Sequence, residues 1–237
     1  MALLYQVGYW VIAVSAVVFA VFVFQKNPKS SIHVTWALLN LAIAVWAALT
    51  DLYWFEPNDD RALLLCRISL YAAALIPIFF AHFCLRFTDR ILRNNVPVMV
   101  GYLFSLVLAG FVLTPAFVPH VSSKLFFPHY TDPGPLFVVF TAEFFILIAY
   151  GEYLLFSSHA HLSANRQGQV RYVAIGLFIA FSCGGTCFLL VYGIPLSPWP
   201  SLLIPIYHLF ISYAIVRHQF MDIRIVIRKS LIYSIIH

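Results

Sequence analysis

The sequence predicts an all-α fold: a polytopic membrane protein forming a seven-transmembrane helix bundle, with its N-terminus outside and its C-terminus in the cytoplasm. Composition is the first reason. Of the 237 residues, 62% are hydrophobic and 10% are charged, whereas a soluble domain carries about 25% charged residues. The apolar residues also run continuously over about 20 residues, as in spanning helices, and do not alternate as in a β-barrel. The third reason is the distribution of basic residues between the two sides.

Seven apolar segments supply the expected spans. The first has no basic region before it and is too long for the core of a signal peptide. The stretch 172–216 has no charged residue but is too long for one span, and residues 193–200 divide it because glycine and proline end helices. The expected spans are residues 3–24, 33–54, 63–86, 96–117, 135–157, 170–192 and 200–217.

Basic residues are concentrated on one side of these spans. The positive-inside rule assigns that side to the cytoplasm, and every connection on it agrees, which supports seven spans independently of hydropathy. The net charge of +5 therefore reflects orientation and contact with anionic lipid, and no nucleic acid partner is expected. Of the 14 Lys and Arg residues, the cytoplasmic ones are Lys26, Lys29, Arg86, Arg90, Arg93, Arg166, Arg171, Arg217, Arg224, Arg228 and Lys229, and the outer ones are Arg61, Arg67 and Lys124.

Residues 1–217 are expected to form one membrane domain. Residues 218–237 would begin a signalling linker or a further span. The chain stops inside the apolar run 231–236, which is no natural domain end, so we expect the protein to continue.

The cysteines indicate neither a disulfide framework nor a metal site. They lie in apolar stretches, form no C-x-x-C pair and fit buried apolar packing; they are Cys66, Cys84, Cys183 and Cys187. In the outer loop 118–134, His120, His129 and Asp132 could bind a metal, but their spacing matches no compact ligand pattern. No cofactor is expected. The same loop is rich in aromatic residues and proline, and it could be either a lid over the bundle mouth or an ordinary connector.

Charged and polar groups at membrane depth are candidate functional residues, because they are costly there. An outer tier consists of Asp51, Tyr53, Arg67, Tyr71 and Glu143. It could bind a ligand with a polar head group, or Arg67 could form an internal ion pair with Asp51 or Glu143.

An inner tier consists of His82, Glu152 and His208. These titratable groups could form a proton-sensitive relay or ordinary interhelical hydrogen bonds. The small residues 182–186, Pro77 and Pro205 could mark a pocket or only close packing.

Several enzyme signatures are absent. The last expected span has no lysine for a retinal Schiff base, and the chain has no nucleotide-binding loop, H-E-x-x-H or nucleophile elbow. No enzyme active site is expected in these residues.

The second half of the chain resembles a known family. The resemblance is carried by RYVAIG at 171–176, GGTCFL at 184–189, YGIP at 192–195, YAIVRHQFMDI at 213–223 and HFCLRFT at 82–88. These segments resemble the N-terminal seven-helix membrane region of bacterial histidine kinases, most strongly over residues 150–230.

The resemblance implies the sensory input domain of a two-component histidine kinase in the inner (plasma) membrane of a bacterium. Such a domain detects an extracellular or membrane-borne cue and passes it through the last span to a cytoplasmic output domain beyond this chain. The chain itself would not be an enzyme, and the full-length kinase would act as a homodimer. Membrane lipid and a small or lipid-like ligand are the implied partners. The output segment would include Tyr213, Arg217, His218 and Asp222.

Other functions remain open from the residues alone. The buried charges and kinked spans would also suit a small transporter or channel, which predicts solute flux in liposomes. The same type of module can precede a cyclic-dinucleotide cyclase, and a stand-alone receptor would dock a partner on its basic connections. The gene sequence downstream of residue 237 distinguishes an input module, which continues into an output domain, from a transporter, a channel or a stand-alone receptor.

Overall fold

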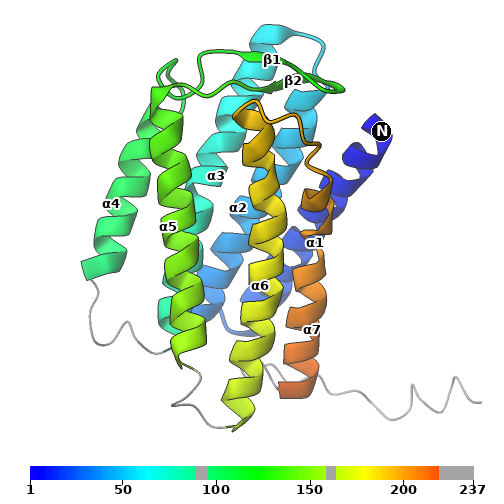
Figure 1. Ribbon diagram of the computed structural model, residues 1–237. Helices are drawn as coiled ribbons and strands as arrows, with labels where there is room; N and C mark the ends of the chain where they lie inside the picture. The colour runs from blue at the N-terminus through cyan, green and yellow to red at the C-terminus, as the bar shows by residue number, and fades with distance from the viewer. Residues whose placement is uncertain (89–95, 159–163, 219–237) are drawn as a thin grey trace, which may run out of the picture.

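The computed structural model of the protein describes residues 1–88, 96–158 and 164–218. It is a helical bundle capped at one end by a two-stranded antiparallel hairpin (Figure 1). The elements are α1 (Ala2–Lys26), α2 (Ser31–Trp54), α3 (Asp59–Phe87), α4 (Val96–Phe111), β1 (Val121–Lys124), β2 (Phe127–Thr131), α5 (Pro135–Ser158), α6 (Ala164–Val191), the 3-10 helix η2 (Trp199–Leu203) and α7 (Ile206–His218).

Within the described residues, five helices are long and apolar enough to cross a membrane: α1, α2, α3, α5 and α6. Helix α4 has 16 residues and α7 has 13. At about 1.5 Å per residue, α7 is about 20 Å long, less than the roughly 30 Å of a hydrocarbon core. The five long apolar helices confirm the predicted helical membrane bundle. The fold is not purely α-helical, because it also contains a small β-hairpin.

Helix α4 ends earlier than the predicted span 96–117. Pro115 disfavours helical backbone at the residue before it. That residue, Thr114, closes the helix end, because its backbone N–H and its hydroxyl donate to the carbonyl of Phe111 at 2.9 and 2.6 Å. The chain then turns inward and Phe117 is fully buried, so the predicted last turn forms the base of the hairpin instead.

Helix α7 begins later than the predicted span 200–217. Pro205 has no N–H to continue a helix, and the residues before it form η2, halfway down the bundle, with α7 in the lower half (Figure 1). Non-helical backbone at membrane depth requires protein partners. Helix α1 packs against this segment and holds it through side-chain hydrogen bonds: the hydroxyls of Tyr9 and Ser201 are 3.0 Å apart, and those of Tyr5 and Ser197 are 2.6 Å apart.

The loop 118–134 forms a lid over one end of the bundle. Strand β1 pairs with β2 in the register Val121 to Thr131 and Ser122 to Tyr130. Phe127, Tyr130 and Thr131 are buried against the helix ends, so the hairpin closes the bundle mouth and is not a loose connector.

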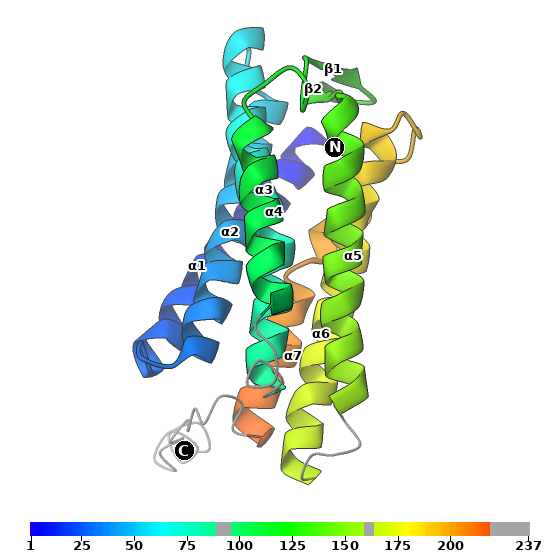
Figure 2. The same ribbon diagram turned by 90° about the vertical axis from the view of Figure 1, so that its left-hand side faces the viewer.

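The helices run between the hairpin end and the opposite end. Figure 2 shows α1 and α2 on one side and α5 and α6 on the other. Helix α3 joins the two sides, because it contacts α2, α4 and α5. The N-terminus of α1 lies at the hairpin end and α7 finishes at the other end (Figure 1). The core between them is continuous from the hairpin to α7.

Candidate ligand-binding cavity

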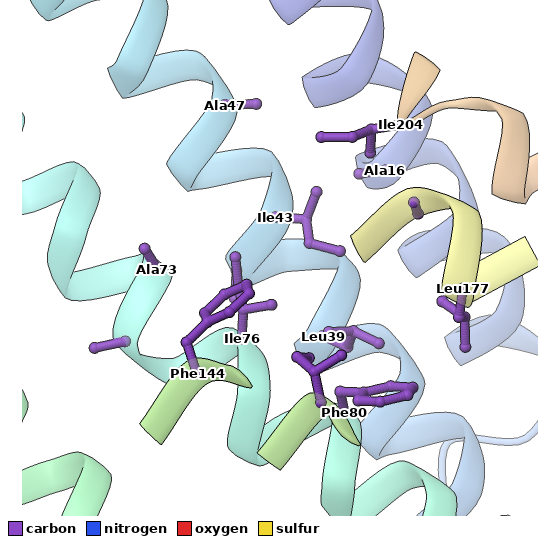
Figure 3. Close-up of a cluster of buried hydrophobic side chains, with 14 of the residues drawn as sticks. Ala16, Leu39, Ile43, Ala47, Ala73, Ile76, Phe80, Phe144, Leu177 and Ile204 are labelled. Atoms are coloured by element: carbon purple, nitrogen blue, oxygen red, sulfur yellow. The ribbon is translucent and has the colours of Figure 1, made fainter. Parts of the chain in front are cut away.

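A cavity lies beneath the hairpin, between α2, α3, α5 and α6. Its volume is about 90 Å³. All four helices line it, together with β2 and with Ile204, the residue after η2. Figure 3 shows Ile43 of α2, Ile76 of α3 and Phe144 of α5 pointing into the same space, with Ile204 beside them. The cavity therefore touches both the lid and the segment that leads into α7.

Phenylalanine rings form one wall of the cavity. Phe137, Phe140 and Phe144 recur on one face of α5 because residues three and four apart share a face, and Phe181 and Phe188 face them from α6. The ring centroids of Phe140 and Phe188 are 5.8 Å apart, and those of Phe144 and Phe188 are 5.3 Å apart. Such tilted ring contacts give the cavity an apolar surface.

Strand β2 forms the roof of the cavity. Tyr130 stacks on Trp54 with ring centroids 5.5 Å apart and 16° between the planes, and its hydroxyl donates to the carbonyl of Cys187 at 3.1 Å. Burial raises the pKa of Tyr130 well above its usual value, so the hydroxyl stays protonated and available as a donor. The adjacent Thr131 hydroxyl lies 3.1 Å from that of Tyr53. The roof is thus bonded to α2 and α6.

Lys124 anchors the hairpin to α6. Its Nζ lies 2.9 Å from the carboxylate of Asp132 and donates to the carbonyls of Thr131 and Val191 at 2.8 and 2.9 Å. One cation thereby joins both strands of the lid to the end of a helix that lines the cavity.

The outer-tier residues lie in separate places around the cavity. Tyr53 lines it. Arg67 donates through Nε and Nη2 to the carbonyl of Val118 at 3.2 and 2.7 Å, so it holds the base of the hairpin. Tyr71 is 44% exposed on α3.

The two outer carboxylates are buried and have hydroxyl or indole neighbours. Glu143 accepts a hydrogen bond from Ser105 of α4, and Trp10 of α1 lies beside Asp51. Across the described residues neither carboxylate forms an ion pair with Arg67. These contacts join helices, and only Tyr53 of this tier borders the cavity.

The inner-tier histidines belong to two different clusters. Nδ1 of His82 lies 2.8 Å from the hydroxyl of Tyr102 in α4. Nε2 of His208 lies 3.3 Å from Oδ1 of Asn40 in α2, and its ring stacks on Phe19 of α1 at 4.3 Å. Each histidine therefore joins its helix to a different neighbour.

Glu152 forms no hydrogen bond or ion pair with either histidine among the described residues. Its side chain is buried near Cys84 of α3. Neither carboxylate oxygen has a hydrogen-bond partner in the part of the chain that the structure describes. Such a group is costly to bury in its charged form.

Comparison with known families identifies the chain. The family profile described as the N-terminal 7TM region of histidine kinase matches residues 9–224. The chain belongs to this family. No curated protein and no solved structure matches it. This histidine-kinase region is a sensory, membrane-spanning region and is not itself catalytic.

The predicted output segment of this histidine-kinase region begins in α7. Tyr213 packs on Tyr172 of α6 with ring centroids 4.6 Å apart. Arg217 and His218 lie in the last turn of α7, and Asp222 lies outside the described residues.

The described residues of this histidine-kinase region contain no cluster of three or more metal-ligating side chains. His120 pairs with Asp132 at 3.2 Å, whereas His129 pairs with Asp59 at 2.9 Å. The four cysteines are free thiols. The loop histidines thus stabilise the lid from two separate positions.

Sequence reasoning missed two sets of residues. Asn40 is polar in the middle of an apolar helix, which marks an interhelical hydrogen bond, and its partner Tyr207 lies in α7. The phenylalanines of the cavity wall carry no such signal, because a ring that lines a cavity and a ring that fills a core look the same in sequence.

Proposed function

We propose that this domain is the membrane-embedded sensory input of a two-component histidine kinase. It detects an extracellular or membrane-borne cue and passes the signal through α7 to a cytoplasmic output domain. Residues 1–217 act as one unit with seven crossings in a bacterial inner membrane, and residues 218–237 begin the signalling linker or a further span. The full-length protein works as a homodimer.

The position of Ile204 carries this proposal. Its side chain lines the cavity, and Pro205 alone separates it from the first residue of α7. A molecule in the cavity would therefore touch the segment that positions the output helix. Residues Tyr213, Arg217, His218 and Asp222 would continue the signal toward the output domain.

The proposed orientation has the hairpin outside and the end of α7 in the cytoplasm. The basic residues support it, because Lys26 and Arg86 lie at the helix ends opposite the hairpin and the cytoplasmic side carries more Lys and Arg. With this orientation the cavity lies in the outer half of the membrane and α7 occupies the inner half.

Signalling requires two states of α7 that bind the cue with different affinity. In the present state α7 is held to α2 by Asn40 and to α6 by the pair of Tyr172 and Tyr213. Displacement of Ile204 by a ligand would change the strain on these contacts, and α7 would shift relative to α2.

Autophosphorylation of the full-length protein in nanodiscs tests the proposal. Ile204→Ala should change the activity by at least about fivefold, the lower end of typical coupling between sites. Leu209→Ala is the matched control, because Leu209 is on α7 and 69% exposed. Equal effects of the two substitutions, or solute flux without a kinase response, would reject the sensory function in favour of a transporter or channel.

A further inference from the structure

We infer that the cavity binds the terminal carbons of a slim, uncharged hydrocarbon chain that enters from the bilayer between α5 and α6. The inference deepens the proposed sensory function and rests on it. Four features of the cavity support it: its lining, its size, its outer wall and its lid.

The lining selects against charge. Among the described residues, none of the side chains that line the cavity is ionisable at neutral pH. Its hydroxyls are already engaged: those of Thr50 and Ser69 lie 2.8 Å apart, and Tyr53 bonds Thr131. A charged head group would find no partner here and would lose its hydration, whereas an apolar chain loses nothing.

The volume limits how much of a molecule can enter. At about 90 Å³ the cavity is smaller than the engineered apolar cavity of about 150 Å³ that binds benzene. A whole amphiphile does not fit, but the last few carbons of an unbranched chain do. The remainder of the chain must stay outside, in the bilayer.

Helix α6 forms the wall between the cavity and the lipid. From Phe181 to Leu189 not one residue of α6 is buried, although Val173 and Leu177 in its inner half are. One face of this outer stretch borders the cavity and the other faces outward. A single helix therefore separates the cavity from the surrounding lipid.

Gly185 lies in this stretch of α6, where the helix packs against α5. It has no side chain, and a Cβ there would lie 3.3 Å from the ring of Phe145 in α5. Phe145 is 45% exposed, and its ring lies 5.4 Å from that of Phe188, which lines the cavity. Rotation of these two rings would open a passage between α5 and α6.

The lid makes the opposite route less favourable. The hairpin is bonded to α2 through Tyr53, to α3 through Arg67 at its base and to α6 through Lys124. Access from water would break several of these contacts, whereas access from the lipid displaces only apolar rings. The chain thus comes from the membrane side.

Photolabelling of the full-length protein in nanodiscs tests the inference. The probe is hexadecanol with a diazirine on its terminal carbon, followed by peptide mass spectrometry. Label is expected on the cavity side of α5 and α6, at Phe144 and Phe181. Ala73→Leu fills the cavity from α3, and overfilling a packed site should reduce this label by about tenfold. Ala142→Leu, at an exposed position of α5, should leave it unchanged.

A second variant controls for the possibility that the first substitution causes misfolding. Ala180→Val fills the cavity from α6 with a smaller change, and both filled variants are checked for a monodisperse elution profile. Label confined to outward positions such as Ile146, or undiminished by both substitutions, would overturn the inference.

The kinase assay with Ile204→Ala is a separate readout from this one. Cavity labelling without a kinase effect would leave the ligand site standing and reject the sensory function. A kinase effect without cavity labelling would reject the ligand site and leave the sensory function standing.

Discussion

The hydroxyl of Tyr207 in α7 donates a hydrogen bond of 2.6 Å to Oδ1 of Asn40 in α2, and neither side chain has any exposed surface. Asn40 in turn donates to the carbonyl of Trp36 at 2.9 Å. This bond joins α7, the shortest α-helix among the described residues, to one of the long helices. It is a fully buried polar contact between α7 and α2.

Removing that bond should loosen α7. Tyr207→Phe deletes one hydroxyl and leaves Oδ1 of Asn40 with only His208 at 3.3 Å. We expect a loss of about 0.5–2 kcal/mol in the free energy of unfolding, the range for interhelical hydrogen bonds in membranes, measured by denaturant titration in mixed micelles. Tyr153→Phe, at a position 61% exposed on α5, should have no effect. An equal loss in both variants would contradict the role of Asn40.

Lys124→Met should release the lid. The substitution keeps the length of the side chain but removes the bonds to Asp132, Thr131 and Val191. Amide hydrogen exchange over 121–131 should then become faster, because local opening costs less free energy.

Arg61→Met is the control for the lid, because Arg61 is exposed at the same end of the bundle. Unchanged exchange in Lys124→Met would mean that Tyr130 and Phe127, which are buried, hold the hairpin without help from the cation.

Gly151→Ala should destabilise the bundle. A Cβ at this position would collide with the ring of Phe80 in α3, which is fully buried and cannot move aside. We expect a cost of about 1–3 kcal/mol, as for overpacked cores, seen as a lower melting temperature.

Gly110→Ala is the matched control, because nothing lies within 4 Å of the added Cβ in α4. It should be neutral or slightly stabilising, since alanine is the better helix former. If Gly151→Ala were equally tolerated, the close approach of α5 to α3 would be wrong.

Glu152→Met should stabilise the domain. The carboxylate is buried, and neither oxygen has a partner in the described part of the chain, so an apolar side chain of similar size should add about 1–3 kcal/mol. The comparison is Asp60→Asn, at an exposed position of α3. A loss of stability in Glu152→Met would instead reveal a partner for this carboxylate, such as bound water or a cation.

The long helices could be predicted from the sequence because hydrophobicity over about 20 residues is a local property. The expected spans at 33–54 and 135–157 match α2 and α5 within a few residues. The short helices differ, because Pro115 and Pro205 decide where α4 ends and α7 begins. The glycine and prolines at 193–200 predict the break before the last helix, whereas Pro205 lies inside the expected span 200–217 and moves the start of the α-helix to Ile206.

The candidate site could be predicted only in part. Tyr53 was expected near the bundle mouth and lines the cavity. An ion pair of Arg67 with Asp51 or Glu143 was one of two alternatives from the sequence. In the structure Arg67 donates to the carbonyl of Val118, because the turn at 112–118 brings that carbonyl over α3. Which side chains pair with each other depends on which helix ends meet in the fold. The position of a residue along its own span does not give this information.

By itself the sequence determined the membrane environment, the long helices and the family, since these follow from composition and from local runs of residues. Only the tertiary structure decided that the loop 118–134 is a lid, that phenylalanines from α5 and α6 line a cavity, and that Ile204 lines the same cavity. The physical reason is that a cavity is a property of packing between distant segments. The residues that surround it are apolar in the same way as those that fill the core beside it.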